Sequence, residues 1–282
     1  MALAPIDRAT LAYLFVALAF NLAYGPRQAP ASLLLPGALV LAAVVAGFLA
    51  PRARATGPTG RLLAEFYPLL LTIALYTHVG LVNAAHGVSH DTTVMGWERA
   101  LFSGQPSLAW IRAFRSPAWS TLMHAAYLSY YAIVASAPLV LWWSGRLRAA
   151  RATLLLIMAT FYGCYTIFLL FPVAGPRYAF PMAQNAATEV PLAVLTHRVL
   201  EGGSAWGTAF PSSHVAAGLV AALAAWRQLR PLGVVLVPLA VLLSLATVYG
   251  QFHYAVDALA GAAVGLCVDG LGRRAGYDSG PE

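Results

Sequence analysis

The sequence predicts an all-α protein, a polytopic integral membrane bundle of about eight transmembrane helices. Three observations predict this class. The 282-residue chain is 60% hydrophobic and only 10% charged, whereas soluble domains carry about 25% charged residues. Apolar runs of spanning length recur along the chain, and arginines gather in alternate connections between these runs. We therefore expect the bilayer to be the solvent for most of the protein surface.

The expected helices follow one another from the N-terminus with short connections. The first covers residues 9–24, is short, and is interpreted as a retained helix because no small-residue cleavage site follows it and several spans come after it. The other expected spans are residues 33–50, 62–84, 118–143, 152–172, 210–226, 231–249 and 254–272. Each is close to the ~20 residues needed to cross about 30 Å of hydrocarbon.

Two of the connections contain features of their own. Residues 86–117 contain Trp97 and Trp110, and Trp119 follows shortly after them. Aromatic side chains of this kind favour the headgroup zone of a membrane. We expect this connection to lie along the membrane interface. Residues 187–203 show weak helical periodicity and are expected to form a second interfacial helix.

The arginines predict the orientation of the bundle. With about eight spans, one side of the membrane receives nearly every cluster, and the positive-inside rule makes that side cytoplasmic. These arginines are Arg8, Arg52, Arg54, Arg61, Arg146, Arg148, Arg151, Arg227, Arg230, Arg273 and Arg274. Both termini are then cytoplasmic, and we expect the membrane to be a bacterial plasma membrane.

The formal net charge of +7 does not indicate a nucleic-acid partner, because the arginines are scattered among short loops and form no basic stripe. The two cysteines, Cys164 and Cys267, both lie in apolar runs, where thiols usually act as small hydrophobic groups.

A group of polar residues begins the sixth expected span. The sequence Phe210-Pro211-Ser212-Ser213-His214 puts a proline at an expected helix start, where its missing N–H costs nothing. The backbone N–H groups of Ser212 and Ser213 would then point out of a helix N-terminus, which suits a phosphate. His214 follows in the first turn. Capping of the helix by these residues is the simpler alternative.

A second group begins the last span, in His253-Tyr254-Ala255-Val256-Asp257. His253 and Asp257 are four residues apart and share a helix face, so the carboxylate can fix the imidazole tautomer and raise its basicity. Arg177, in Gly175-Pro176-Arg177-Tyr178, has a planar fork that suits two phosphate oxygens. All three groups fall on the extracytoplasmic side of the predicted bundle. A structural His–Asp pair, an interfacial arginine anchor and an interfacial role for Tyr178 are the alternatives.

Residues from about Phe171 to Gly265 resemble the type 2 phosphatidic acid phosphatase superfamily of membrane enzymes. The segment 210–214 is similar to its second motif, and residues 253–257 with Gly261 are similar to its third. The resemblance implies a core of about six helices, a phosphohistidine at His253 oriented by Asp257, and protonation of the leaving group by His214. Arg177, Ser212, Ser213 and Tyr178 would bind the substrate phosphate. It implies no metal and no other cofactor.

Two departures from the phosphatase branch of this family concern its cations. Where that branch has a lysine and a Ser-Arg pair, this chain has Leu170 and the pair Ala246-Thr247. A phosphomonoester approaches charge −2 and a phosphodiester carries −1, so fewer cations suit a diester. The pattern is more similar to the inositol phosphorylceramide synthase and sphingomyelin synthase branch. That resemblance implies transfer of a phospho-headgroup from a phospholipid to a lipid alcohol.

Two other functions remain open at this point. A lipid phosphate phosphatase, acting on phosphatidic acid or a polyprenyl diphosphate, would use the same residues with water as acceptor. A lipid transporter would show broken helices and inverted repeats, which the sequence lacks. Within the chain, residues 1–60 are expected to add two helices to a core at residues 61–275, and residues 276–282 to form a short polar tail. Nothing in the sequence predicts the oligomeric state.

Overall fold

The computed structural model describes residues 3–28 and 30–277 and is built from helices. The helices are α1 (Pro5–Tyr24), α2 (Ala31–Val44), α3 (Ala50–Ala53), α4 (Pro58–His86), α5 (Asp91–Phe102), α6 (Pro106–Ala113), α7 (Pro117–Trp143), α8 (Leu147–Leu170), α9 (Pro176–Ala179), α10 (Pro191–Gly203), α11 (Ser213–Gln228), α12 (Arg230–Tyr249) and α13 (Ala255–Arg274). A π-helical turn, Val45–Leu49, joins α2 to α3, so the second span is one continuous stretch. The predicted helical membrane fold is confirmed, and the chain is an integral membrane protein.

Seven helices in the described part of the chain are long and apolar enough to cross a membrane. They correspond to seven of the eight expected spans. The expected span at residues 210–226 corresponds to α11, which has only 16 residues and begins at Ser213. Residues 210–212 precede the helix, and Ser212 is its N-cap; the Phe210-Pro211 peptide bond is cis.

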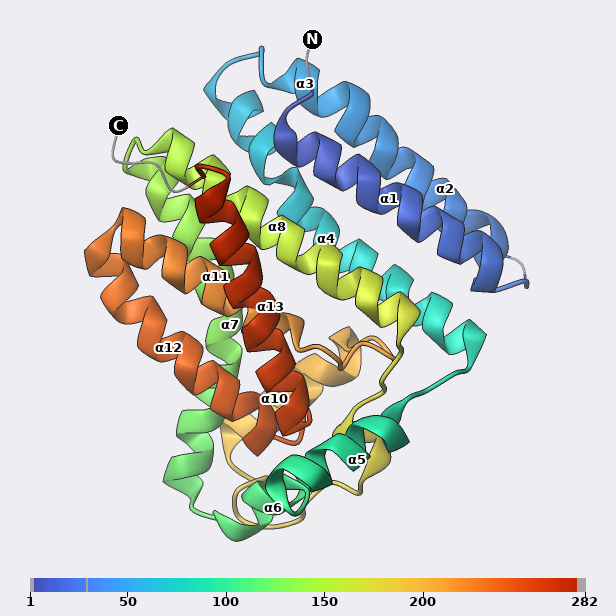
Figure 1. The fold of residues 1–282 in the computed structure, drawn as a ribbon, viewed down its shortest axis with the longest axis vertical. Helices are drawn as coiled ribbons and strands as arrows, with labels where there is room; N and C mark the ends of the chain where they lie inside the picture. The colour runs from blue at the N-terminus through green and yellow to red at the C-terminus, as the bar shows by residue number, and fades with distance from the viewer. Residues whose placement is uncertain (1–2, 29, 278–282) are drawn as a thin grey trace.

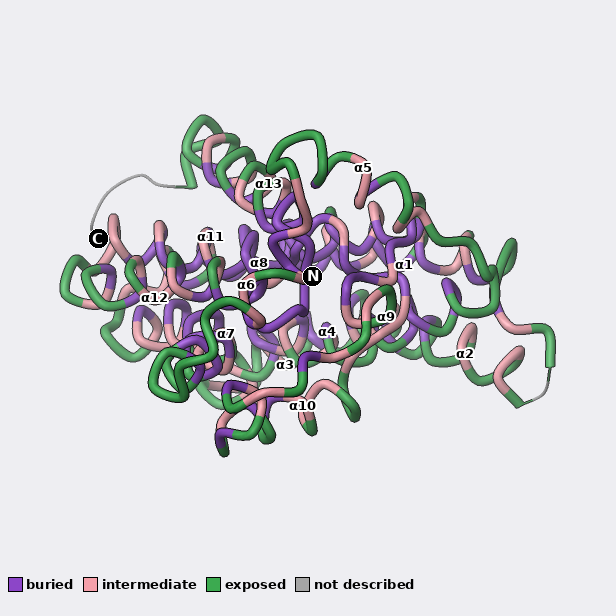
Figure 2. Tube along the Cα trace, turned by 90° about the horizontal axis from the view of Figure 1, so that it is seen from below, coloured by how far each residue is buried: buried purple, intermediate pink, exposed green. Residues whose placement is uncertain are grey.

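Helix α8 forms the centre of the bundle. It packs against α1, α4, α7, α11 and α13, and 67% of its most apolar window is buried, compared with 22% for the second span. Figure 2 shows this contrast as purple along α8 and green and pink along α2. The helix at the edge therefore presents most of its apolar surface outward, as expected of a helix in contact with lipid.

Helices α11 and α13 approach each other closely because α11 is rich in alanine and α13 has glycines at the contact. A Cβ at Gly261 would lie 2.4 Å from the carbonyl oxygen of Ser212, and one at Gly265 would lie 2.8 Å from that of Ala216. Small residues four apart are typical of tightly packed membrane helices. This packing holds the beginnings of the two helices together.

The two ends of the bundle differ in chemistry. At one end, arginines pair with buried carboxylates: Arg54 contacts Asp7 at 2.5 Å and Glu65 at 3.2 Å, and Arg227 pairs with Asp269. Figure 1 shows the start of α1, with α3, at this end and the short helices α5 and α6 at the other. The expected helix in residues 187–203 is α10, and the connection 86–117 also contains two short helices, α5 and α6. Of the predicted tail 276–282, residues 278–282 lie outside the described residues.

Candidate active site

Three connections meet at the end of the bundle that holds α5 and α6. They are the segment after α8, the segment before α11, and the turn between α12 and α13. A parallel bridge pairs Val173 with Thr208, and the Ala209 N–H donates to the Val173 carbonyl at 2.8 Å. The first two connections are thereby fixed to each other through their backbones.

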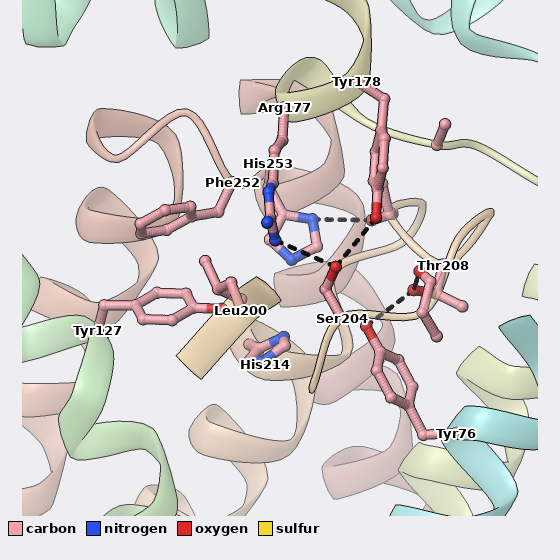
Figure 3. Close-up of a pocket in the computed structure, with 13 residues that line it drawn as sticks. Tyr76, Tyr127, Arg177, Tyr178, Leu200, Ser204, Thr208, His214, Phe252 and His253 are labelled. Atoms are coloured by element: carbon pink, nitrogen blue, oxygen red, sulfur yellow. Dashed lines mark hydrogen bonds between the residues drawn. The ribbon is translucent and has the colours of Figure 1, made fainter. Parts of the chain in front are cut away.

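A cavity of about 40 Å³ lies between these connections, and Figure 3 shows its main side chains. It is lined by Tyr76, Tyr127, Ala174, Arg177, Tyr178, Leu200, Ser204, Ala205, Thr208, Ala209, His214, Phe252 and His253. The structure thus brings Arg177, His214 and His253 into one pocket, although up to 76 positions of sequence separate them. In the described part of the chain, Arg177 is the one arginine that lines it.

The His253 imidazole is held in a defined orientation. Its Nδ1 lies 2.9 Å from the carbonyl oxygen of Ala209, which can only accept a hydrogen bond, so Nδ1 carries the proton and Nε2 the free electron pair. His253 is 5% exposed. Burial lowers the pKa of His253 from 6.5 to about 4, and the hydrogen bond to Ala209 opposes this shift only in part. The ring is therefore neutral at neutral pH, as a nucleophilic nitrogen must be.

Asp257 lies close to His253 but mainly orders the start of α13. One carboxylate oxygen, Oδ2, accepts a hydrogen bond from the backbone N–H of Tyr254 at 2.8 Å and lies 3.4 Å from His253 Nδ1. The other, Oδ1, is buried without a partner in the described part of the chain. The expected orientation of His253 by Asp257 is thus shared with the Ala209 carbonyl, which makes the shorter contact. The sequence contains no signal for a carbonyl 44 positions away.

His214 faces His253 across the pocket, with ring centroids 5.7 Å apart. Its ring packs against Tyr130 at 4.3 Å and Tyr127 at 5.5 Å. Its Nδ1 is buried with no hydrogen-bond partner among the described residues. Both rings line the same pocket, so a group bound there can contact the two imidazoles together.

The expectation for Pro211 and Ser212 needs correction. Pro211 precedes the N-cap and is not the first helical residue, because α11 begins at Ser213. The Ser212 N–H donates to the backbone carbonyl of Asp257 at 2.9 Å, and the Ser212 hydroxyl accepts from the Val215 N–H, so neither group is directed at a ligand. Ser213, at the first helical position, keeps the predicted backbone geometry.

Arg177 extends into the pocket from α9. Its Nη1 donates to the Ser204 hydroxyl at 3.1 Å, and the Tyr178 hydroxyl lies 3.0 Å from the same oxygen, as Figure 3 shows. The described residues place no carboxylate within ion-pair distance of Arg177. Its positive charge is therefore uncompensated in the pocket and suits an anionic ligand. Ser204, which links both side chains, was not predicted from the sequence.

Asp91 is a second residue that sequence reasoning missed. Its Oδ1 accepts hydrogen bonds from the Gly175 N–H and the Tyr254 hydroxyl, both at 2.8 Å, and its Oδ2 accepts from the Ala174 N–H at 2.8 Å. One carboxylate therefore joins the segment that carries Arg177 to the segment that carries His253. The sequence offered one weak signal, an acidic residue directly after His90 in an aromatic connection.

Glu98 has a similar role two helical turns further along α5. It is fully buried, and it accepts hydrogen bonds from the Ala255 N–H at 2.9 Å and from the Ser107 N–H and hydroxyl. Burial raises the pKa of Glu98, while these hydrogen bonds oppose the rise. A carboxylate at the first turn of α13 compensates the positive end of that helix.

We found no cluster of three or more His, Cys, Asp or Glu side chains suited to a metal within residues 3–28 and 30–277. His86, His90 and Asp91 do not converge, because Asp91 bonds the Gly175 segment while the His90 ring stacks on Phe171 at 4.2 Å.

The fold and the pocket together define a polytopic helical membrane protein with two imidazoles and an unpaired arginine at one end, the groups that phosphoryl chemistry requires. A profile of the PAP2 superfamily matches residues 92–269, more than half of the chain, and the chain belongs to this family. Membership supports a phosphatase-like or phosphotransferase-like lipid enzyme in general. No curated protein and no solved structure matches the chain.

Proposed function

We propose that this enzyme transfers a phospho-headgroup from a phospholipid to a lipid alcohol through a phosphohistidine at His253. The observation that carries the proposal is the composition of the pocket, where Arg177 is the one arginine among the described lining residues and faces two imidazoles. A single fixed positive charge matches the single negative charge of a phosphodiester. A phosphomonoester, with charge near −2, favours a site with more cations.

The first half of the reaction forms the covalent intermediate. His253 Nε2 attacks phosphorus, the bond from phosphorus to the lipid oxygen breaks, and His214 gives a proton to that oxygen. Arg177 binds the non-bridging phosphoryl oxygens. The Ala209 carbonyl and Asp257 stabilise the positive charge that develops on the His253 ring. The products of this step are a free lipid alcohol and a phosphohistidine that keeps one ester bond, to the headgroup.

The second half reverses these roles. The hydroxyl of an acceptor lipid gives its proton to His214, its oxygen attacks phosphorus, and the bond from phosphorus to His253 breaks. Protons and charge balance over the cycle, so the chain needs no other reactant. Ser213 at the start of α11 and Tyr178 at the pocket edge are proposed as further contacts of the phosphoryl oxygens.

The test is an assay of the purified protein in lipid nanodiscs. The substrates are phosphatidic acid and a headgroup-labelled phosphodiester lipid, the latter with and without a lipid-alcohol acceptor, and His253→Ala is the blank. We expect label on the acceptor, little inorganic phosphate, and an acid-labile, base-stable phosphoprotein that His253→Ala abolishes. Phosphate release from phosphatidic acid as the main activity would replace this proposal with the phosphatase function.

We further propose that the site faces the extracytoplasmic side of a bacterial plasma membrane and that both termini are cytoplasmic. The arginine-rich end and the pocket end of the bundle support this orientation. Ala179→Cys and Ser144→Cys, at exposed positions near opposite ends, test it in a background where Cys164 and Cys267 are serine. In intact cells an impermeant maleimide should label Ala179→Cys and spare Ser144→Cys. The reverse labelling would invert the topology.

A further inference from the structure

A second and larger cavity opens beside the candidate active site. Its volume is about 440 Å³, and it shares Tyr76, Leu200, Ser204 and His214 with the small pocket. The other lining residues are mostly apolar or aromatic and include Leu70, Ile73, Tyr130, Tyr131 and Ala135. Apart from the His214 ring, no described lining residue is ionisable near neutral pH, so the cavity suits an uncharged and largely apolar ligand.

The cavity opens toward the lipid-facing surface of the bundle. Helices α4 and α7 each pack along α8, which forms the floor between them, and α10 contributes residues at the pocket end. Leu70 and Ile73 on α4 are 67% and 72% exposed, and Tyr131 on α7 is 57% exposed. These three residues line the cavity and also face outward, so a lipid chain can enter sideways from the bilayer. The α4 wall lies outside residues 92–269, which match the superfamily.

The position of the cavity relative to the two histidines indicates which part of a lipid it holds. At phosphorus, the entering and departing atoms lie roughly in line on opposite sides. With His253 as the entering atom, the departing oxygen lies on the far side, next to His214. His214 lines the pocket and the cavity alike, and the Tyr130 ring packs on it at 4.3 Å. A lipid oxygen at His214 therefore has its hydrocarbon directed into the cavity.

We infer that this cavity is the binding site for the hydrocarbon chain of the lipid alcohol, both the alcohol that departs and the alcohol that accepts. The inference rests on the proposed function for its chemistry. Because the second half-reaction retraces the first, the two alcohols occupy one site in turn. Apolar and aromatic walls also exclude water from the position beside His214, which disfavours hydrolysis of the phosphohistidine.

Binding can be measured without turnover. A hexadecanol that carries a terminal diazirine is photolysed with the nanodisc-reconstituted protein, and labelled peptides are identified by mass spectrometry. We expect label on the parts of α4, α7 and α8 that line the cavity. Ala135→Phe fills part of the cavity and should lower this labelling roughly tenfold, because extra volume in a formed site weakens binding by about that factor. The matched control is Ala132→Phe, an exposed position one turn away on α7 that does not line the cavity.

The outcomes separate this inference from the proposed function. Cavity labelling that Ala135→Phe abolishes and Ala132→Phe preserves supports the inference, even when no headgroup transfer is detected. Label spread evenly over the outer helix surfaces, equal in both variants, overturns it, even when headgroup transfer is active. Where transfer is active, Ala135→Phe should slow the second half-reaction, from the preformed phosphohistidine to a hexadecanol acceptor, roughly tenfold and leave its rate with a butanol acceptor within about twofold of wild type. An equal loss with both acceptors also overturns the inference.

Discussion

Asp91 provides the most direct test of how the pocket is assembled. Its carboxylate receives the N–H groups of Ala174 and Gly175 on one segment and the Tyr254 hydroxyl on another. Asp91→Asn keeps the size of the side chain but removes its charge and turns one acceptor into a donor. That donor must face a backbone N–H, so at least one of the bonds is lost and Arg177, two residues from Gly175, is no longer held in register.

The expected magnitude follows from the number and type of these bonds. A hydrogen bond to a charged group contributes about 1.5–3 kcal/mol. Because Asp91 is only partly buried and water can replace some of the loss, we expect a net cost of about 2 kcal/mol, which corresponds to roughly 30-fold in affinity or rate. Tyr254→Phe removes one bond to the same carboxylate and should cost roughly tenfold.

The assay is the dissociation constant for orthovanadate, a phosphate analogue whose binding requires no knowledge of the lipid substrate. Thermal unfolding is measured alongside it, and Thr92→Asn, an exposed change on the same turn of α5, is the control. Adding Tyr254→Phe to Asp91→Asn should weaken vanadate binding by no more than about threefold further, because Tyr254 acts through a carboxylate whose charge Asp91→Asn has already removed. Wild-type vanadate affinity in Asp91→Asn would refute the role of this carboxylate.

Three further predictions concern His253, Gly261 and Arg177. Since burial lowers the pKa of His253 to about 4, its ring should still be neutral at pH 5, where an ordinary histidine is mostly protonated. Nitrogen NMR of the ¹⁵N-histidine-labelled protein, with the His253 signals assigned from His253→Gln, should show the neutral ring. A His253 titration midpoint above pH 6 would contradict this prediction. Gly261→Ala should lower stability by about 1–3 kcal/mol because its Cβ meets the Ser212 carbonyl, whereas Gly270→Ala on the same helix, with its nearest neighbour at 4.0 Å, should be neutral or slightly stabilising in thermal unfolding. Equal melting temperatures for these two variants would show that the contact at Gly261 does not limit how closely α11 and α13 approach. Arg177→Lys keeps the charge but loses the planar guanidinium, so vanadate affinity should fall at least roughly tenfold. Arg198→Lys, at an exposed position of α10, is the control and should bind vanadate as the wild type does. Wild-type vanadate affinity in Arg177→Lys would exclude bidentate binding of the anion by Arg177.

The membrane fold was predictable from the sequence because it depends on local composition. A stretch such as 152–172 must be helical in lipid whatever its neighbours, and the structure has α8 there, at Leu147–Leu170. The start of α11 was predicted less well. The sequence Phe210-Pro211-Ser212 predicts a helix that begins at the proline. In the structure the Ser212 N–H donates a hydrogen bond to the backbone carbonyl of Asp257, 45 positions away, and Ser212 lies outside the helix.

The same distinction applies to the pocket. His214, His253 and Arg177 stood out because an ionisable side chain at the end of an apolar run is costly unless it has a role. Asp91, Glu98 and the Ala209 carbonyl did not stand out, because each acts through contacts with distant segments. An aspartate in a polar connection has the same local sequence whether it points to water or bonds two other loops. The division at residue 60 between added helices and core likewise stays a prediction.

The shortness of α11 couples the chemistry to the mechanics of the bilayer. Its 16 residues rise about 24 Å, less than the ~30 Å of an average hydrocarbon layer. A placement of Arg227 at the headgroups of one leaflet would put His214, at the other end of the helix, several ångströms beneath the headgroups of the opposite leaflet. A thicker membrane submerges His214 further, and a thinner one raises it toward the surface. The rate of the enzyme should therefore depend on the acyl-chain length of the surrounding lipids even when they are not substrates.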